Sequence, residues 1–281
     1  MLFHNLNATL LEHLPDEFAV AQRAVFYSDA LFETIRVFDG EIPLFERHRE
    51  RLLSGLTALG FHLPEGWGRG TLKSEILRTA HPNARVRLTV WRSPGGRYAP
   101  ENDQPQFLIT SEPLANNRFE WPVKETKIGV CQSVRLPIDH FSNLKTLNGS
   151  RYVAAAREAR SNDLDDVLIL NCHERICEAT SSNVFWLESG QLCTVPLTEG
   201  CVAGVFRATV MVTMSEVVEK NITAEQLSNA DEIFLTNAVR GIVPVRIFAG
   251  RLLPNRLTEQ LFHTIQDALW PKNAKGNLPK S

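Results

Sequence analysis

Three stretches in the first half of the chain carry strand patterns. Residues 32–38 read as a strand with Phe32, Thr34, Arg36 and Phe38 on one face and Glu33, Ile35 and Val37 on the other, and residues 86–91 alternate apolar and polar side chains as a half-buried strand does. A further strand is predicted at residues 106–110. The Asp39-Gly40 pair after the first stretch is a hairpin signal. It predicts that residues 41–45 return as the partner of residues 32–38.

Helical spacing separates these strands. Three leucines at i, i+4 and i+7 predict a helix over residues 46–59, with Gly60 as its C-terminal stop. A second helix is predicted over residues 68–80. The tail from residue 271 onward is polar and basic, and we expect it to fray.

The second half of the chain again mixes the two patterns. Apolar runs bounded by turn residues predict strands at residues 126–132, 166–170, 175–179, 183–187, 191–195, 232–236 and 241–247. Helical patterns predict helices at residues 153–159, 204–219 and 256–270.

A polar segment at residues 112–120 is the best candidate for a linker. We therefore predict two domains of a mixed α/β (α+β) protein. The smaller N-terminal domain covers residues 1–115, a linker covers residues 116–125, and the larger domain covers residues 126–281.

Composition narrows the class of protein. The 281 residues include 43% hydrophobic and 22% charged residues with a net charge of −2, as in a soluble globular protein. No overall basic excess points to nucleic acid, and no apolar run reaches transmembrane length. The N-terminus lacks a basic region typical of a signal peptide, and five cysteines without a C-x-x-C pair indicate free thiols. We expect a cytoplasmic enzyme.

Lys145 is the first candidate for chemistry. It stands between a strand-like run and a helix-like run, where α/β enzymes tend to place their reactive groups. A partly desolvated amine loses affinity for its proton and becomes a nucleophile or Schiff-base former. Most lysines, by contrast, lie on solvated faces.

Several familiar signatures are missing. There is no G-x-G-x-x-G or G-x-S-x-G motif, and Gly55 to Gly60 has P-loop spacing but Phe61 in place of lysine. The run from His173 to Cys177 lacks the second histidine of a zincin helix. We therefore predict no metal site.

Three further segments have both an ordinary and a functional interpretation. Glu178 fits a strand-end carboxylate, Arg51 fits a solvated helix face, and Gly204 fits the start of a helix. The functional alternatives are an acid–base or ion-pairing carboxylate, an anion-binding cation, and a phosphate-binding helix N-terminus. Each segment alone leaves both interpretations open.

Together, seven blocks in this order resemble the class IV aminotransferase family, the pyridoxal-phosphate enzymes of fold type IV. The blocks are FETIR (32–36), HRERL (48–52), LKTLN (144–148), DDVLILN (165–171), EATSSNVF (178–185), GVFR (204–207) and TNAVRGIVPV (236–245). The resemblance implies a barrel-like sheet in the larger domain. It also implies a homodimer whose active site lies near the domain junction and the subunit boundary.

The resemblance also implies roles for single residues. Lys145 would form a Schiff base with pyridoxal phosphate, Glu178 would pair with the pyridine nitrogen, and Arg51 would bind the phosphate. Further cofactor contacts are implied at Ser181, Ser182, Asn183, Gly204, Val205, Phe206, Thr236, Asn237 and Ala238. Substrate contacts are expected at Phe32, Thr34, Arg36, Arg92, Arg97 and Val239.

The subclass is less sharply indicated. The Gly95-Gly96-Arg97 turn and Thr236-Asn-Ala238 resemble aminodeoxychorismate lyases, which release pyruvate and 4-aminobenzoate for folate synthesis. Their substrate carries two carboxylates, for which Arg36, Arg92 and Arg97 are candidate anchors or, equally, solvated side chains. Residues 91–98 lack the Arg-x-His trap of D-amino-acid transaminases, and Lys145 is not followed by the Gly-Gly-Asn-Tyr of branched-chain enzymes. Transamination of a small amino acid and a non-catalytic binding role remain alternatives.

Overall fold

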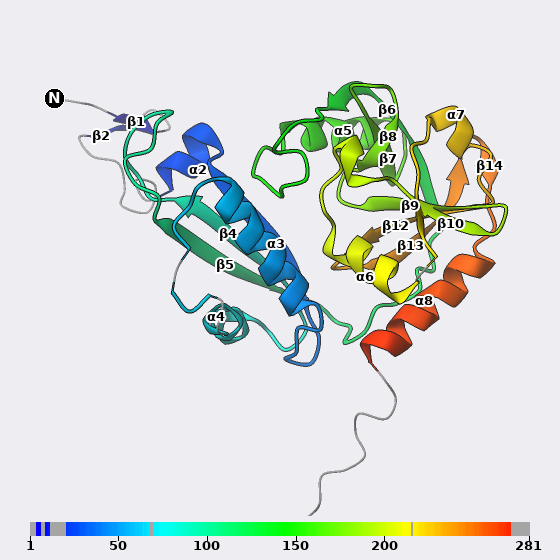
Figure 1. Ribbon diagram of the computed structural model, residues 1–281, viewed down its shortest axis with the longest axis horizontal. Helices are drawn as coiled ribbons and strands as arrows, with labels where there is room; N and C mark the ends of the chain where they lie inside the picture. Colours follow the sequence, from blue (N-terminus) through cyan, green and yellow to red (C-terminus); the bar gives the residue numbers. More distant parts are fainter. Residues whose placement is uncertain are drawn as a thin grey trace, which may run out of the picture.

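The computed structural model describes residues 4–6, 9–11, 21–63, 65–67, 70–214 and 216–270. Two larger sheets lie side by side in this part of the chain, and a single segment after β5 joins them (Figure 1). A short antiparallel pair, β1 (His4–Leu6) and β2 (Thr9–Leu11), lies near the N-terminus.

The smaller sheet is antiparallel in the order β3 (Ala30–Val37), β4 (Ala84–Arg92), β5 (Pro105–Pro113). Its helices are α2 (Gln22–Tyr27), α3 (Phe45–Ala58) and α4 (Thr71–Thr79). Apolar residues of α3 and α4 form one core with alternate residues of β3 and β4. Because strand side chains alternate between faces, the other residues of β3 and β4 remain free to line a site.

The larger sheet has the order β11-β10-β9-β12-β13-β6-β7-β8, with β14 added to β13. Its strands are β6 (Thr126–Leu136), β7 (Asp166–Asn171), β8 (Ile176–Ala179), β9 (Asn183–Glu188), β10 (Gln191–Thr194), β11 (Val218–Glu219), β12 (Glu232–Asn237), β13 (Gly241–Phe248) and β14 (Arg251–Leu252). The accompanying helices are α5 (Ser150–Ser161), the 3-10 turn η1 (Leu197–Glu199), α6 (Val205–Thr213), α7 (Ala224–Leu227) and α8 (Arg256–Leu269).

The connection between β8 and β9 shows that this sheet is curled. Five strand spacings separate these strands along the sheet, which is roughly 24 Å if the sheet were flat. A turn of only three residues joins them, and the Ala179 N–H donates to the Ser182 carbonyl at 2.8 Å. So short a turn spans at most about 14 Å. The sheet therefore closes toward a barrel, as expected from the resemblance.

The two halves share an aromatic core. The ring of Phe119, in the connecting segment, lies 5.0 Å from Phe38 after β3 and 5.3 Å from Phe206 in α6. Residues of α8, including Phe262, belong to the same buried cluster. Packing of this kind fixes one sheet against the other, and so positions the residues that lie between them.

Most predicted elements are confirmed, but the predicted hairpin is wrong. Phe38 and Glu41 form an isolated bridge, and the chain then turns into α3 instead of returning as a strand. Pro43 offers no N–H to a ladder. β3 pairs along its full length with β4, and its other edge is taken by the segment around Lys145.

The helix predicted over residues 204–219 is too long. It ends at Thr213, and Val218–Glu219 form β11, paired in parallel with Cys193 and Thr194 of β10. β-branched residues prefer strands when a sheet edge offers them partners. The tail from residue 271 lies outside the described residues.

No helix or strand is found between Pro113 and Thr126, where the linker is predicted. The bounds of the two domains themselves stay a prediction. Across the described ranges, none of the helices combines the length and apolar character that spanning a bilayer requires.

Candidate active site

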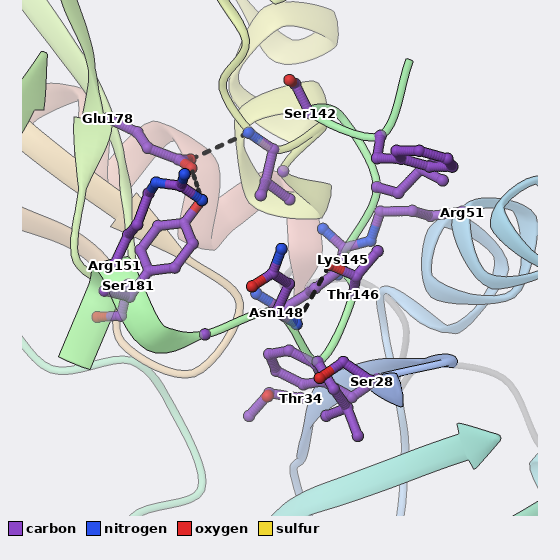
Figure 2. A pocket seen from close by; sticks show the side chains of 18 of the residues that line it. Ser28, Thr34, Arg51, Ser142, Lys145, Thr146, Asn148, Arg151, Glu178 and Ser181 are labelled. Carbon is purple, nitrogen blue, oxygen red and sulfur yellow. Dashed lines mark hydrogen bonds between the residues drawn. The ribbon is translucent and has the colours of Figure 1, made fainter. Parts of the chain in front are cut away.

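An open pocket of about 1270 Å³ lies between the two sheets. Its walls come from β3, β4, α3, the segment before α5, the β8–β9 turn, the start of α6 and the β12–β13 turn. Figure 2 shows Glu178 on one side of this space, with Lys145 and Arg51 on the other. The pocket thus brings together residues that are more than 100 positions apart in the chain.

Lys145 is held at the free edge of β3. Its carbonyl accepts from the Phe32 N–H at 2.9 Å, and the Leu147 N–H donates to the Ala30 carbonyl at 3.1 Å. The ammonium nitrogen lies 4.5 Å from the centre of the Phe32 ring. Burial, reinforced by the Arg51 charge, lowers the pKa of Lys145 to about 8. About a tenth of the amine is therefore unprotonated at pH 7, far more than for an ordinary lysine.

Glu178 is 3% exposed and is surrounded by neutral donors. Its Oε1 accepts from the Tyr152 hydroxyl at 2.6 Å, and its Oε2 accepts from the Val202 N–H at 3.1 Å and Asn183 Nδ2 at 3.4 Å. Burial raises the pKa of Glu178 to about 7, although these hydrogen bonds and the Lys145 charge oppose the rise. Among the residues that the structure describes, no cation forms an ion pair with this buried carboxylate.

Arg51 is fixed by a second buried carboxylate. Its Nε donates to Glu33 Oε1 at 2.8 Å and its Nη2 to Glu33 Oε2 at 2.5 Å, while Nη1 donates to the Ala203 carbonyl at 2.9 Å. His48 Nδ1 lies 2.7 Å from the same carboxylate. Burial alone would raise the pKa of Glu33, but Arg51 and His48 hold it at about 2. Two of the five guanidinium N–H donors remain for a ligand.

The start of α6 adjoins Arg51 and offers backbone donors. No side chain caps this helix, so the N–H groups of its first turn, including Val205 and Phe206, have no side-chain acceptor. A Cβ at Gly204 would lie 1.8 Å from Asn183 Oδ1, so this close approach requires glycine. Thr236 Oγ1 is buried in the pocket wall without a hydrogen-bond partner.

These features fit pyridoxal phosphate. Arg51, the α6 N-terminus and the unpartnered Thr236 hydroxyl together supply a cation and donors for a phosphate dianion. The buried carboxylate of Glu178 suits a protonated ring nitrogen, and Lys145 supplies an amine. The roles predicted for single residues remain predictions, but their surroundings suit those roles.

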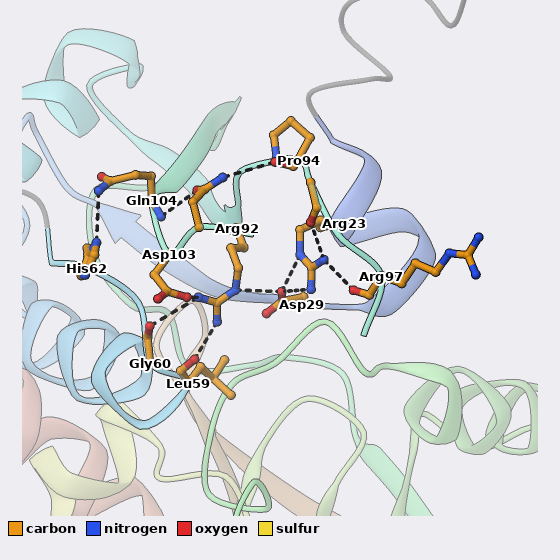
Figure 3. A network of polar contacts seen from close by, with 12 residues as sticks. Arg23, Asp29, Leu59, Gly60, His62, Arg92, Pro94, Arg97, Asp103 and Gln104 are labelled. Atoms are coloured by element: carbon orange, nitrogen blue, oxygen red, sulfur yellow. Dashed lines mark hydrogen bonds and ion pairs between the residues drawn. The ribbon is translucent and has the colours of Figure 1, made fainter. Parts of the chain in front are cut away.

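The pocket wall contains all the cofactor residues that the sequence indicated, and also Phe32, Thr34 and Val239. The three predicted carboxylate anchors are placed differently. Arg36 does not line the pocket; it is 9% exposed and bonds the Asn116 carbonyl. The Arg97 side chain is exposed and points away from its neighbours in Figure 3. Neither side chain lines the pocket of its own chain, and the predicted contacts stay predictions.

Arg92 borders the pocket, but four of its five N–H donors are occupied (Figure 3). It pairs with Asp29 at 2.9 Å and with Asp103, and it donates to the carbonyls of Leu59 and Gly60. A guanidinium with this many partners stabilises the conformation of the segment between β4 and β5. The interpretation of Arg92 as a substrate anchor is therefore revised.

Sequence reasoning missed four residues around the pocket: Glu33, His48, Arg87 and Tyr152. Glu33 stood on the apolar face of a predicted strand beside Ile35 and Val37, and a charge in such a place signals a buried ion pair. The other three had no distinctive signal, because their partners are distant in the sequence.

Comparison with known proteins agrees with this geometry. The family model described as amino-transferase class IV matches residues 30–248. A probable branched-chain-amino-acid aminotransferase of Thermotoga maritima is 36% identical over 224 residues, which cover 77% of this chain and 76% of that protein. An aminodeoxychorismate lyase of Vibrio harveyi is 28% identical over 246 residues, with 83% and 86% covered.

A solved structure is similar to this chain over most of its length. The 4-amino-4-deoxychorismate lyase of Pseudomonas aeruginosa has a TM-score of 0.79 and 29% identity, covering 92% of this chain and 96% of that chain. The matched family region spans the smaller sheet, all strands of the larger sheet except β14, and every cofactor residue named above. The chain therefore belongs to the class IV aminotransferases, a family of pyridoxal-phosphate-dependent enzymes.

Proposed function

We propose that this enzyme is an aminodeoxychorismate lyase that releases pyruvate and 4-aminobenzoate. Arg87 of β4 is the observation that carries the proposal. Its guanidinium lies 3.9 Å from the centre of the Phe32 ring, whose surroundings also include the Lys145 amine. Among the described residues no carboxylate forms an ion pair with Arg87; its Nε donates only to the Thr89 hydroxyl at 3.3 Å.

A partly buried cation without an anion favours an anionic ligand. Burial and the neighbouring Arg85 lower the pKa of Arg87, so its charge is held at an energetic cost. Arg151 and Arg240 also line the pocket and form no ion pair with a carboxylate of the described chain. Aminodeoxychorismate carries two carboxylates, and guanidinium groups match their geometry. We therefore propose these three arginines as the groups that bind the substrate carboxylates. They take the place of Arg36, Arg92 and Arg97, which the sequence suggested.

Each residue of the site has a separate role in this proposal. Bound pyridoxal phosphate supplies an electron sink for the charge that develops at the substrate Cα. Lys145 lies within the pocket as an amine with a pKa of about 8, suited to take the Cα proton near neutral pH. Glu178 provides an anion for the ring nitrogen, while Arg51 and the α6 N-terminus hold the phosphate. Phe32 covers the amine with an apolar surface that limits access of water.

The lyases of Vibrio harveyi and Pseudomonas aeruginosa support the proposal by their similarity. A second candidate is transamination of a small amino acid, and the aminotransferase of Thermotoga maritima favours it. Both reactions need the same lysine and carboxylate. They differ in what fills the pocket and in where the next proton is delivered.

Turnover of aminodeoxychorismate tests the proposal. We expect 4-aminobenzoate and pyruvate to appear together without an added keto acid, and Arg87→Gln to raise the KM for this substrate. Borohydride reduction and peptide mapping should label Lys145 and leave Lys73 and Lys220 unlabelled. An enzyme that ignores this substrate but transfers the amino group of leucine, alanine or glutamate is a transaminase.

We also propose that the enzyme is a cytoplasmic homodimer. Apolar side chains near the pocket opening are exposed, with Tyr98 at 91%, Val153 at 60% and Phe141 at 52%, as at a surface that a second copy covers. All five cysteines are free thiols, which suits a reducing compartment. Light scattering checks the dimer: a stable, fully active monomer of 31.6 kDa would contradict it.

A further inference from the structure

Tyr152 makes the shortest hydrogen bond that Glu178 receives. It lies in the first turn of α5, seven residues after Lys145, and its hydroxyl is 2.6 Å from Glu178 Oε1. Burial and the Glu178 charge raise the pKa of Tyr152, so the phenol keeps its proton and acts as a donor. The contact therefore ties the lysine-bearing segment to the carboxylate on β8.

Tyr152 differs from the other groups around Glu178 in the carboxylate oxygen that it contacts. The charges facing Glu178 are Lys145 and Arg51, and both favour its ionised form. The buried thiols of Cys177 and Cys201 have raised pKa values and stay neutral. No ion pair with Glu178 is found within the described ranges, and the other donors bond Oε2 at 3.1 and 3.4 Å. Oε1 has Tyr152 as its side-chain donor.

We propose that Tyr152 is a positioning residue that favours the ionised form of Glu178 and keeps it aimed into the pocket, where it can hold the ring nitrogen of the cofactor. The proposal rests on the proposed role of Glu178. It adds that the segment from Lys145 through the first turn of α5 contributes two groups to the site. One is the Lys145 amine, and the other is the Tyr152 hydroxyl, a neutral donor that stabilises the counter-anion of a cationic ring.

A Tyr152→Phe variant separates this role from simple packing, because the ring stays and only the donor is lost. Without the phenol, Glu178 should bind its proton more tightly. We expect the pKa of Glu178 in the cofactor-free protein to rise from about 7 by about one pH unit. Carboxyl ¹³C NMR measures this value, and Glu178→Gln assigns the signal.

Cofactor affinity provides the second measurement. An ionised Glu178 is needed to pair with a protonated ring, so pyridoxal phosphate affinity should fall as pH drops through the pKa of Glu178. In Tyr152→Phe the midpoint should move upward with that pKa, giving about tenfold weaker binding below it. In a Glu178→Gln background the same substitution should change affinity little, because the partner is gone.

The experiment has one control variant and one substitute for Tyr152→Phe. Tyr27→Phe removes a phenol from the N-terminal half of the same pocket and should leave both midpoints at the wild-type value. If Tyr152→Phe does not fold, 3-fluorotyrosine at position 152 keeps the shape but is a stronger donor, and should lower the pKa of Glu178.

The outcomes are distinguishable. An unchanged Glu178 pKa in Tyr152→Phe, or in the fluorinated protein, overturns the positioning role whatever reaction the enzyme catalyses. A raised pKa with unchanged cofactor affinity at every pH overturns the role of Glu178 in the proposed function. A loss of affinity that persists in the Glu178→Gln background means that Tyr152 contacts the cofactor itself, and also overturns the proposal.

Discussion

Each of the two sheets beside the pocket contains a buried carboxylate, and the two carboxylates are satisfied in opposite ways. Glu33 of the smaller sheet does not line the pocket itself; it pairs with Arg51, which does, and with His48, and its pKa is about 2. On the wall of the larger sheet, Glu178 receives hydrogen bonds from neutral groups, and its pKa is about 7. Glu33 is 1% exposed and Glu178 3%, so burial does not explain the difference.

The charge of the contacting groups distinguishes a structural carboxylate from one that is suited to bind a ligand. A carboxylate that already has cations in contact contributes to the fold and orients them, as Glu33 orients Arg51. A buried carboxylate with neutral donors alone keeps an unmet preference for a cation. Glu178 therefore fits the cationic ring of a cofactor, and Glu33 fits the support of Arg51, the cation proposed to hold its phosphate.

The largest expected effect is on stability. Glu33→Gln would leave Arg51 and His48 buried without their anion, so we expect the free energy of unfolding to fall by about 3–5 kcal/mol. Denaturant unfolding measures it. Glu46→Gln is the control, because Glu46 is an exposed partner of Arg49 on the same helix and should cost less than about 1 kcal/mol. Equal effects of the two substitutions would refute the distinction.

Glu178→Gln should instead act on catalysis. The folded protein loses no ion pair, but the ring nitrogen loses its counter-anion, so turnover should fall about 10²–10³-fold. Steady-state kinetics at saturating cofactor measures this. Glu199→Gln is a control outside the pocket wall: it breaks a pair between buried Glu199 and half-buried Arg175 and should affect stability more than turnover. Full turnover in Glu178→Gln would contradict the assigned role.

The two carboxylates should also give stability opposite pH dependences. The folded-state pKa of Glu178 lies above the usual 4.5, so its contribution is fully present below pH 4.5 and is lost as the pH rises through about 7. Relative to Glu178→Gln, the cofactor-free protein should lose on the order of 3 kcal/mol over this range. The contribution of Glu33 runs the other way, present above pH 4.5 and lost as the pH falls through about 2. Unfolding curves at several pH values measure both, and parallel pH curves for the wild type and Glu178→Gln would exclude a raised pKa.

The smallest effect concerns the phosphate. Arg51→Ala should weaken binding of pyridoxal phosphate by about 10- to 150-fold, the value of a charge-assisted contact of about 1.5–3 kcal/mol. Because Arg51 also pairs with Glu33, the substitution should lower stability too, and the double variant with Glu33→Gln removes the unpaired carboxylate. Pyridoxal, which lacks the phosphate, is the matched control ligand. A similar loss of affinity for both ligands would argue against a phosphate contact.

The sequence by itself determined the local elements and the order of the motifs. Leucine spacing predicted α3, the apolar run at residues 166–170 predicted β7, and the small-residue segment before α5 singled out Lys145. These are short-range properties: side-chain periodicity and turn chemistry act within a few residues and are read directly from the chain. Seven motif blocks in the right order then indicated the family, and the family model confirmed it.

Only the tertiary structure decided which partners these residues meet. The free edge of β3 takes the Lys145 segment rather than the predicted hairpin strand, a choice made between backbone groups more than 100 residues apart. The same holds for the arginines of β4. The local pattern suggested Arg92 as a carboxylate ligand and did not suggest Arg87, but Asp29 pairs with Arg92 from 63 positions away, whereas Arg87 has no ion pair with a carboxylate of the described residues. An ion pair depends on distances of a few ångströms between groups that only folding brings together, so the sequence shows which residues are charged, and only the fold decides which of them are paired.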